Sequence, residues 1–565
     1  MEVEYPQTTA ILHDLDVNAG NSADDENVDV EKPGDSDGEE AFKGGWSSAI
    51  YIMWSEIAER FAQYGISSNL MLYLTKELHE SLVDAAETFY AYVGFSALLP
   101  LLGAFVADSY TGRYMAVVYS SLIYIVGVLT LTVSVGFVSE PYKKVSFFIS
   151  LYIVVLAQAG FRPCIQALAA DQFNEDNEKQ KRAKNSFFNW WFFGIAAGAS
   201  AAAVVVSYIQ VAFNWWIGFL IVAISMILAF LLFIAGSKLY QVQIPKGSPW
   251  TAIVQVLVAA FRKRRITPID GTEQEVFNTG PQEALSPTNQ YKFLDKATII
   301  DEIDKSSEVQ NPWRLCTVTQ TEEVKMLLRL LPVWLSTLMF FVVIVQPHAF
   351  FVQQAAAMDR KILAFTITPV AFIVSVGLFV IITVPLYDWG FVPLARKITN
   401  IPSGITVLQR IGTGLVISIL DMVVAAMVEA RRLQVARDHG LDDEPKAEVP
   451  MNVLWLLPQC IILGIADIFG IVGVQQFFYE QIPDGMKSIG SAVYLSALGV
   501  GSLLSHVLVS TVAGIFPHWL TNNLNASRLD NFYWLVSGLS IIWLGFFLIV
   551  SNSYVYKKPA GAAPH

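Results

Sequence analysis

Long apolar runs without charge dominate the pattern of the chain. Runs such as YIVGVLTLTVSVGFV and GFLIVAISMILAFLLFIAG recur along most of its length. A run of ~20 apolar residues spans the ~30 Å hydrocarbon core of a bilayer when it rises about 1.5 Å per residue as a helix. We count twelve candidate spans, near residues 46–75, 86–108, 114–137, 144–169, 186–209, 214–238, 323–352, 362–386, 405–430, 450–476, 488–515 and 530–555.

These spans predict an all-α membrane protein, because each must satisfy its own backbone hydrogen bonds in lipid and is too continuous for a barrel strand. A long hydrophilic stretch, 239–322, separates a bundle over 46–238 from a bundle over 323–555. An acid followed by basic residues after the second and eighth spans, at Asp108–Arg113 and Asp388–Lys397, forms a weak internal repeat. Two six-helix halves are therefore predicted.

Three segments outside the two helical bundles differ from them in composition or in expected position. Residues 1–45 are acidic and lack a signal-peptide pattern, which predicts a disordered cytosolic tail, and residues 556–565 form a short C-terminal tail. Residues 248–265 are apolar and end in four basic residues, as in a helix lying at the membrane interface. That helix either braces the two halves or binds anionic lipid or a calmodulin-type partner.

Composition and charge agree with this reading. The chain is 54% hydrophobic and 15% charged, against about a quarter charged in globular proteins, and much of its net charge of −12 lies in the acidic tail. The three cysteines have no metal-ligand spacing, so neither a metal nor a disulfide is expected. No nucleophile–base pair or phosphate-binding loop is present, so the sequence does not predict an enzyme, a cofactor or a nucleic-acid partner.

Basic residues gather on the loops of the tail side, which predicts that this side is cytoplasmic. Arg431, Arg432 and Arg437 form an exception on an opposite-side loop. The sequon Asn525–Ala526–Ser527 would then lie on the outer or lumenal face, open to glycosylation.

Charged residues inside the spans are the candidates for chemistry. Spacings of three and four put Glu56, Glu59 and Arg60 on one face of the first helix. Each costs roughly 2.5–3.5 kcal/mol at the bilayer centre, so the three form either a proton site facing a water-filled cavity or a structural ion pair.

Arg162 and Asp467 are two further charges within spans, one in each half. If they meet when the cavity is closed on one side, a salt bridge that breaks on protonation or substrate entry would link chemistry to rocking of the halves. A fixed pair that holds the bundle together is the alternative, and Arg162 could instead bind an anionic group of the substrate.

Motifs typical of a known family extend over about residues 45–555. They are EIAERFAQYGISSNLMLYLT, GAFVADSYTGRY, ALAADQF, NSFFNWWFF, FFVQQAAAMDR and FFYEQIPDGMKS. The chain resembles the plant nitrate and peptide transporter family, the plant branch of the proton-coupled oligopeptide transporters in the major facilitator superfamily. The resemblance implies that Glu56, Glu59 and Arg60 take part in proton coupling and that Arg162 and Asp467 form the pair between the halves. Arginine and aspartate stand here where the family usually has lysine and glutamate.

Other positions also depart from the family pattern. Gln63 replaces a usual tyrosine, Gln476 replaces a frequent glutamate, and Ile344 aligns with a histidine of nitrate-carrying relatives. The candidate residues that line the substrate cavity are Tyr64, Asn189, Trp190, Gln346 and His348. His348 could instead be a hydrogen-bonded polar residue near a helix end. Asp108 and Arg113 are the candidate gating loop.

The function expected from these features is secondary active transport by alternating access, as proton-coupled symport of a peptide, nitrate, a hormone or a specialised metabolite. The alternatives are a membrane protein that senses substrate and signals, and an uncoupled facilitator. A kinase or other cytosolic partner could act on the tail or central loop, and the sequence is consistent with the plasma membrane or the vacuolar membrane.

Overall fold

The computed structural model describes residues 44–173, 178–242, 249–265, 288, 290–305, 310–362, 365–401, 404–445, 447–482, 487–554 and 556. All described residues belong to one unit, Lys43–His565. The predicted tails at 1–45 and 556–565 therefore lie almost entirely outside the described residues.

The described secondary structure is mainly helical. In chain order the helices and helical turns are α1 (Trp46–Ser67), α2 (Leu70–Lys76), α3 (Leu82–Val106), η1 (Ala107–Thr111), α4 (Arg113–Gly136), α5 (Lys143–Ala170), α6 (Glu178–Ala201), η2 (Ala202–Val206), α7 (Ser207–Ala212), α8 (Trp215–Ala235), η3 (Ser237–Leu239), α9 (Pro249–Arg262), η4 (Lys292–Thr298), α10 (Glu302–Lys305), α11 (Val318–Ile344), η5 (Pro347–Phe351), α12 (Val352–Ala356), α13 (Pro369–Pro385), η6 (Leu386–Phe391), α14 (Val392–Thr399), α15 (Val407–Asp438), η7 (Val453–Leu456), α16 (Leu457–Gln481), α17 (Lys487–Ile515) and α18 (Leu529–Ser553).

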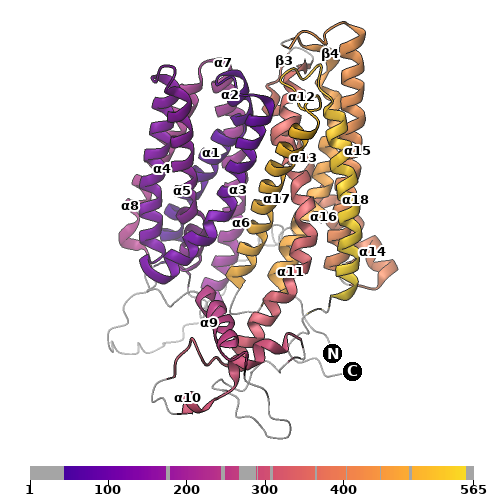
Figure 1. Cartoon of the computed structure of the whole chain (residues 1–565). Helices are drawn as coiled ribbons and strands as arrows, with labels where there is room; N and C mark the ends of the chain where they lie inside the picture. Colours follow the sequence, from indigo (N-terminus) through magenta and orange to yellow (C-terminus); the bar gives the residue numbers. More distant parts are fainter. Residues whose placement is uncertain are drawn as a thin grey trace, which may run out of the picture. The chain divides into compact units, whose positions relative to one another are not determined.

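The membrane helices fall into two groups, which Figure 1 shows in indigo to magenta and in pink to yellow. In the N-terminal group α4 packs on α5 and α8, and α1 packs on α6 and α8. In the C-terminal group α15 packs on α16 and α18, and α11 packs on α17 and α18. The groups meet where α3 packs against α17. This arrangement agrees with the predicted fold.

Eleven helical segments among the described residues are long and apolar enough to cross a membrane. Helix α1 has 22 residues, enough to cross a bilayer, but it carries Glu56, Glu59 and Arg60 and is not among the eleven. The predicted number of twelve therefore depends on α1.

Short strands replace the predicted starts of two spans. Strand β1 (Met358–Asp359) pairs in parallel with β4 (Val449–Asn452), and β2 (Lys361–Ile362) pairs antiparallel with β3 (Phe365–Thr366). Helix α13 consequently begins at Pro369 rather than 362, and α16 begins at Leu457 rather than 450. Proline occupies the first turn of both helices, where its fixed φ and missing N–H are tolerated.

The apparent exception in the basic loops has a structural cause. Helix α15 continues to Asp438, beyond the predicted end at 430, so Arg431 and Arg432 are helical rather than in a loop. Arg432 is fully buried and pairs with Glu429 at 2.6 Å. This pairing removes a free positive charge from the end of the molecule opposite α9 (Figure 1).

The predicted glycosylation site is not available in the folded chain. Asn525 is only 4% exposed. Its Oδ1 accepts a hydrogen bond from Arg432 Nη1 at 2.7 Å, and its Nδ2 donates to the backbone oxygens of Glu444 and Ala447. The basic loops predict the side of the membrane on which the sequon lies but not its exposure, and Arg432 of the buried Glu429–Arg432 pair binds Asn525.

Helix α9 lies within the predicted interfacial segment. Its buried Val256, Ala259 and Ala260 pack in one cluster with Val324 of α11. Lys263, just beyond α9, is 2.6 Å from Asp304 Oδ2, and Arg314 is 2.9 Å from Asp304 Oδ1. These contacts attach the segment to α11 and to the central loop, and its bracing of both halves stays a prediction.

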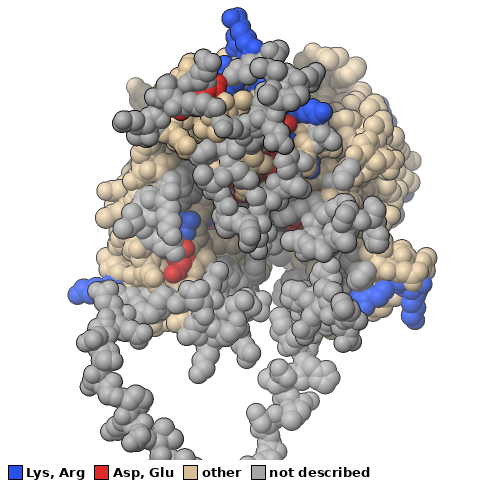
Figure 2. Space-filling view, turned by 90° about the horizontal axis from the view of Figure 1, so that it is seen from below, with Lys and Arg blue, Asp and Glu red and all other residues tan. Residues whose placement is uncertain are grey.

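Lys and Arg side chains stand at several points along the edge of the face that carries α9 (Figure 2).

The three cysteines lie in different parts of the chain. Cys164, Cys316 and Cys460 are all buried and unbridged. Burial raises the pKa of Cys316, which packs beside α9, to about 11.

Candidate functional site

The charged motif of α1 is buried and internally paired. Arg60 Nε lies 2.8 Å from Glu56 Oε1, one helical turn away, and 3.6 Å from Glu59 Oε2. Glu56 is 2% exposed and Glu59 is fully buried. Arg60 also donates to Gln63 Oε1 at 3.0 Å, at the position where the sequence departs from the family pattern. The predicted common face of α1 is confirmed by these distances.

Arg162 joins this motif from α5. Its Nε donates to Glu59 Oε1 at 3.0 Å, and its Nη1 donates to the backbone oxygen of Ser96 on α3 at 3.3 Å. Glu59 therefore lies between two guanidinium groups. Glu56 Oε2 and Arg162 Nη2 are buried without a hydrogen-bond partner. We call Glu56, Glu59, Arg60 and Arg162 the N-terminal cluster; its two carboxylates balance its two guanidiniums.

Asp467 of α16 is not part of that cluster. It makes no ion pair within the described part of the chain, and its Oδ1 is buried without a hydrogen-bond partner. Tyr494 of α17 interacts electrostatically with both Asp467 and Tyr64 of α1, which brings Asp467 and the α1 motif to the same region between the helix groups. The Arg162–Asp467 pair is not formed in this conformation, and its formation in another one stays a prediction.

Asp421 is a buried acid that the sequence analysis missed. It lies in α15, is fully buried, and neither carboxylate oxygen has a hydrogen-bond partner. Asp467 on the adjacent α16 interacts with it electrostatically. A search for single charges inside apolar runs would have found it in LVISILDMVVAAMV.

The candidate cavity residues have different surroundings. Gln346 is fully buried, accepts a hydrogen bond from Tyr90 at 2.6 Å and donates to the backbone oxygen of Val342. His348 stacks on Phe89 with ring centroids 6.4 Å apart. These two residues therefore contact α3 of the other helix group.

The remaining candidate wall residues lie on α1 and α6. Tyr64 is half-buried beside the N-terminal cluster, whereas Trp190 is 56% exposed and meets Phe193 edge to face. The side chains of Asn189 and Asp108 lie outside those that the structure describes. A substrate cavity lined by these residues stays a prediction.

The predicted gating loop has a partner that the sequence analysis did not assign. Arg113 Nη1 lies 2.9 and 2.7 Å from the two carboxylate oxygens of Asp171, directly after α5. The turn between α3 and α4 is the π-helical η1, which ends at Gly112 with φ +76°. The eighth span also passes into a π-helical segment, η6, but there the chain continues directly into α14. The weak repeat of the sequence therefore shares the π-helical segment and not the turn that follows it.

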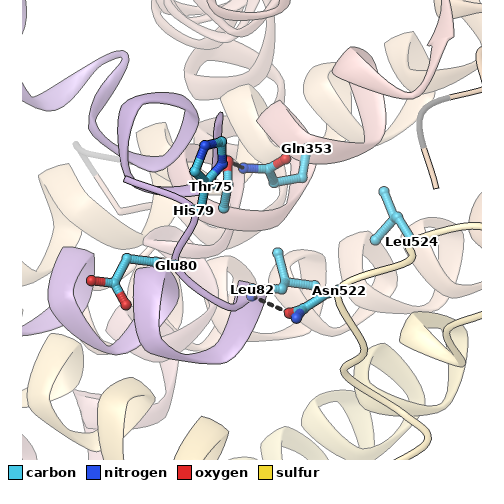
Figure 3. Close-up of a pocket in the computed structure, with 7 residues that line it drawn as sticks. All are labelled: Thr75, His79, Glu80, Leu82, Gln353, Asn522 and Leu524. Carbon is cyan, nitrogen blue, oxygen red and sulfur yellow. Dashed lines mark hydrogen bonds between the residues drawn. The ribbon is translucent and has the colours of Figure 1, made fainter. Parts of the chain in front are cut away.

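At the end opposite α9, hydrogen bonds join the two helix groups. Gln353 Nε2 donates to Thr75 Oγ1 at 3.1 Å, and the backbone N–H of Leu82 donates to Asn522 Oδ1 at 2.9 Å. These residues, with His79, Glu80 and Leu524, line a cavity of about 230 Å³ (Figure 3). This end of the interface is closed by direct contacts.

Comparison with known proteins identifies the family of this chain. A family model described as "PTR2: POT family" matches residues 114–521. The chain belongs to the POT family. Its similarity to Protein NRT1/PTR FAMILY 5.4 of Arabidopsis thaliana is 47% identity over 532 residues, covering 91% of this chain and 96% of that protein. Protein NRT1/PTR FAMILY 5.14 of the same plant is 42% identical, covering 91% and 94%.

Solved structures of the POT family share the fold. The crystal structure of an auto-inhibited POT family peptide transporter superposes with a TM-score of 0.69 at 19% identity, covering 91% of this chain and 99% of that one. The POT family transporter PepTSo gives the same TM-score at 20% identity, covering 90% and 98%. The resemblance read from the motifs is confirmed, and the chain is a multi-pass membrane transporter of a small-molecule substrate rather than an enzyme.

Proposed function

We propose that the chain is a proton-coupled symporter of a small solute. The observation that carries the proposal is the position of Glu59, fully buried between Arg60 and Arg162. A proton taken up by Glu56 or Glu59 would leave the N-terminal cluster with excess positive charge. Because an unpaired buried charge is costly, Arg162 would then gain by moving toward another carboxylate.

Asp467 is the carboxylate that we assign to this second position. It lies in the other helix group and lacks a basic partner among the described residues. An Arg162–Asp467 contact would favour a different arrangement of the two helix groups, which would link proton binding to alternating access. Glu56, Glu59 and Arg60 are the proton-coupling residues in this proposal, and Asp108 and Arg113 are the gating loop.

The substrate belongs to the classes of peptide, nitrate, hormone or specialised metabolite, with Tyr64, Asn189, Trp190, Gln346 and His348 as proposed cavity residues. Gln346 and Tyr90 bond each other between the helix groups, so opening of that contact would expose polar groups to a substrate. One of the two solved structures named above is that of a peptide transporter. For this chain, we propose the plasma membrane or the vacuolar membrane as the location.

The test is current and uptake in voltage-clamped oocytes at acidic and neutral external pH, with pooled peptides, nitrate, hormones and glycosides. We expect a substrate-evoked inward current that grows with acidity and is lost in Glu59→Gln. Glu448→Gln is the matched control, because Glu448 is an exposed acid paired with Arg360. Uptake that does not depend on the proton gradient, in a chain present at the cell surface, would favour the uncoupled facilitator. Substrate-dependent signalling without uptake would favour the sensing alternative.

A further inference from the structure

Asp421 occupies an unusual position for an acid. It lies near the middle of the 32-residue helix α15 and has no exposed surface. Both carboxylate oxygens lack a hydrogen-bond donor. An ionised carboxylate needs such donors or a cation when it leaves water, because isolated burial of the charge costs far more than a typical domain can tolerate.

Asp421 forms no ion pair among the described residues. Asp467 and Cys460 of α16 and Tyr533 of α18 interact with it electrostatically. Helix α11 carries no charged residue from Val333 to Ile344. Arg432 lies 11 positions further along α15, about 16 Å by the rise of a helix, and is held there by Glu429 and Asn525.

We propose that Asp421 holds a proton inside the C-terminal helix group, next to Asp467. A neutral Asp421 removes the repulsion that a second negative charge would exert on Asp467. Asp467, which is half-buried, thus remains able to exchange its own proton or to accept Arg162. Asp421 is a positioning residue in this account, since it acts through Asp467. Its protonation in this conformation does not require that transport be proton-coupled.

The decisive measurement is infrared spectroscopy of the purified full chain in lipid nanodiscs at neutral pH. Protonated carboxyl groups give a C=O band separate from that of carboxylates. We expect Asp421→Asn to lose part of this band while it keeps the fold. The control Glu448→Gln, which removes an exposed ion-paired carboxylate, should leave the band unchanged. An unchanged band in folded Asp421→Asn would overturn the proposal.

A second measurement uses the unmodified chain, so that it does not depend on the folding of a variant. Hydrophobic carbodiimides modify protonated carboxyls in apolar surroundings, and mass spectrometry of the peptides locates the modified residue. We expect modification of Asp421 and none of Glu429, which is equally buried but paired with Arg432. An unmodified Asp421 together with stabilisation by added sodium or potassium would identify a cation site instead and overturn the proposal. If uptake proves independent of protons but the band is lost in Asp421→Asn, only the proposed function fails.

Discussion

Acidic residues inside the two helix groups have opposite surroundings. In the N-terminal group Glu56 and Glu59 are matched by Arg60 and Arg162 within 3.6 Å. In the C-terminal group Asp421 and Asp467 interact with each other, and neither forms an ion pair among the described residues. Paired charges resist the loss of either partner, whereas unpaired acids are most stable when neutral. Substitutions should therefore have unequal effects in the two groups.

The largest effect is expected for Arg162→Gln. Glu59 would keep only the 3.6 Å contact with Arg60, so we expect a loss of about 3 kcal/mol in unfolding free energy, as for a broken buried pair. Asp421→Asn replaces an unpaired acid by a neutral amide of the same shape and should change stability by less than about 1 kcal/mol. Thermal unfolding of both variants in detergent compares them directly. Equal losses would contradict the distinction between the two helix groups.

Asp304 is a paired acid in the central loop, outside the membrane-spanning helices. Burial alone would raise the pKa of Asp304, but the hydrogen bond and charge of Lys263 and the backbone N–H of Asp301 outweigh it and hold this pKa below its usual range. Its contribution to stability is thus complete above the unfolded pKa of about 3.9 and is lost as the pH falls through the lower folded value.

The variant Asp304→Asn should therefore be less stable than the wild type at neutral pH, by about 2 kcal/mol for lost charged hydrogen bonds. The difference should shrink on acidification below pH ~4. Unfolding temperatures of the two chains across this pH range provide the measurement. A difference that stays constant with pH would show that the pairing of Asp304 does not change on folding.

A smaller effect is expected at the contact between the groups. Tyr90→Phe removes the donor to Gln346 Oε1, and both residues are fully buried, so we expect a loss of about 1–3 kcal/mol. The closed end should also open more often, which labelling of Thr75→Cys by a membrane-impermeant thiol reagent would detect. Tyr208→Phe, at a residue that is 54% exposed, is the control and should label at the wild-type rate.

The smallest effect is expected for the exposed pair Arg360–Glu448, at 2.6 Å. Surface ion pairs contribute about 0–1 kcal/mol, so Glu448→Gln should leave both unfolding temperature and uptake almost unchanged. High salt should remove even this difference. A large loss would show that the short strand pairing near Arg360 depends on the ion pair.

Much of the fold follows from the sequence because apolar runs of bilayer length leave few alternatives. The helix starts at Pro369 and Leu457 were missed, since short strand pairs between distant segments do not appear in hydropathy. Glu56, Glu59 and Arg60 were correctly placed on one face because helical spacing decides that locally. The partner of Arg162 is a different matter, because Glu59 and Asp467 are both carboxylates and the choice between them depends on the conformation.

Asp421 and Asn525 illustrate two further limits. Asp421 was visible in the sequence as an acid within an apolar run, but its lack of partners depends on neighbouring helices. Asn525 matched a glycosylation motif, yet tertiary contacts with Arg432 bury its amide. Local patterns therefore identify candidate residues, and packing decides whether they are available.

The burial of Asn525 also sets an order of events during biosynthesis. On the orientation that the basic loops predict, the sequon enters the lumen where glycosyltransferase acts on chains still being assembled. Asn525 is protected only once α15 and the segment before α18 have come together. A chain that carries a glycan there could not form the Arg432 contact, so we expect the glycosylated fraction to mark molecules that assembled late. An endoglycosidase mobility shift confined to degraded or retained protein would match this expectation, and a shift in the mature pool would refute it.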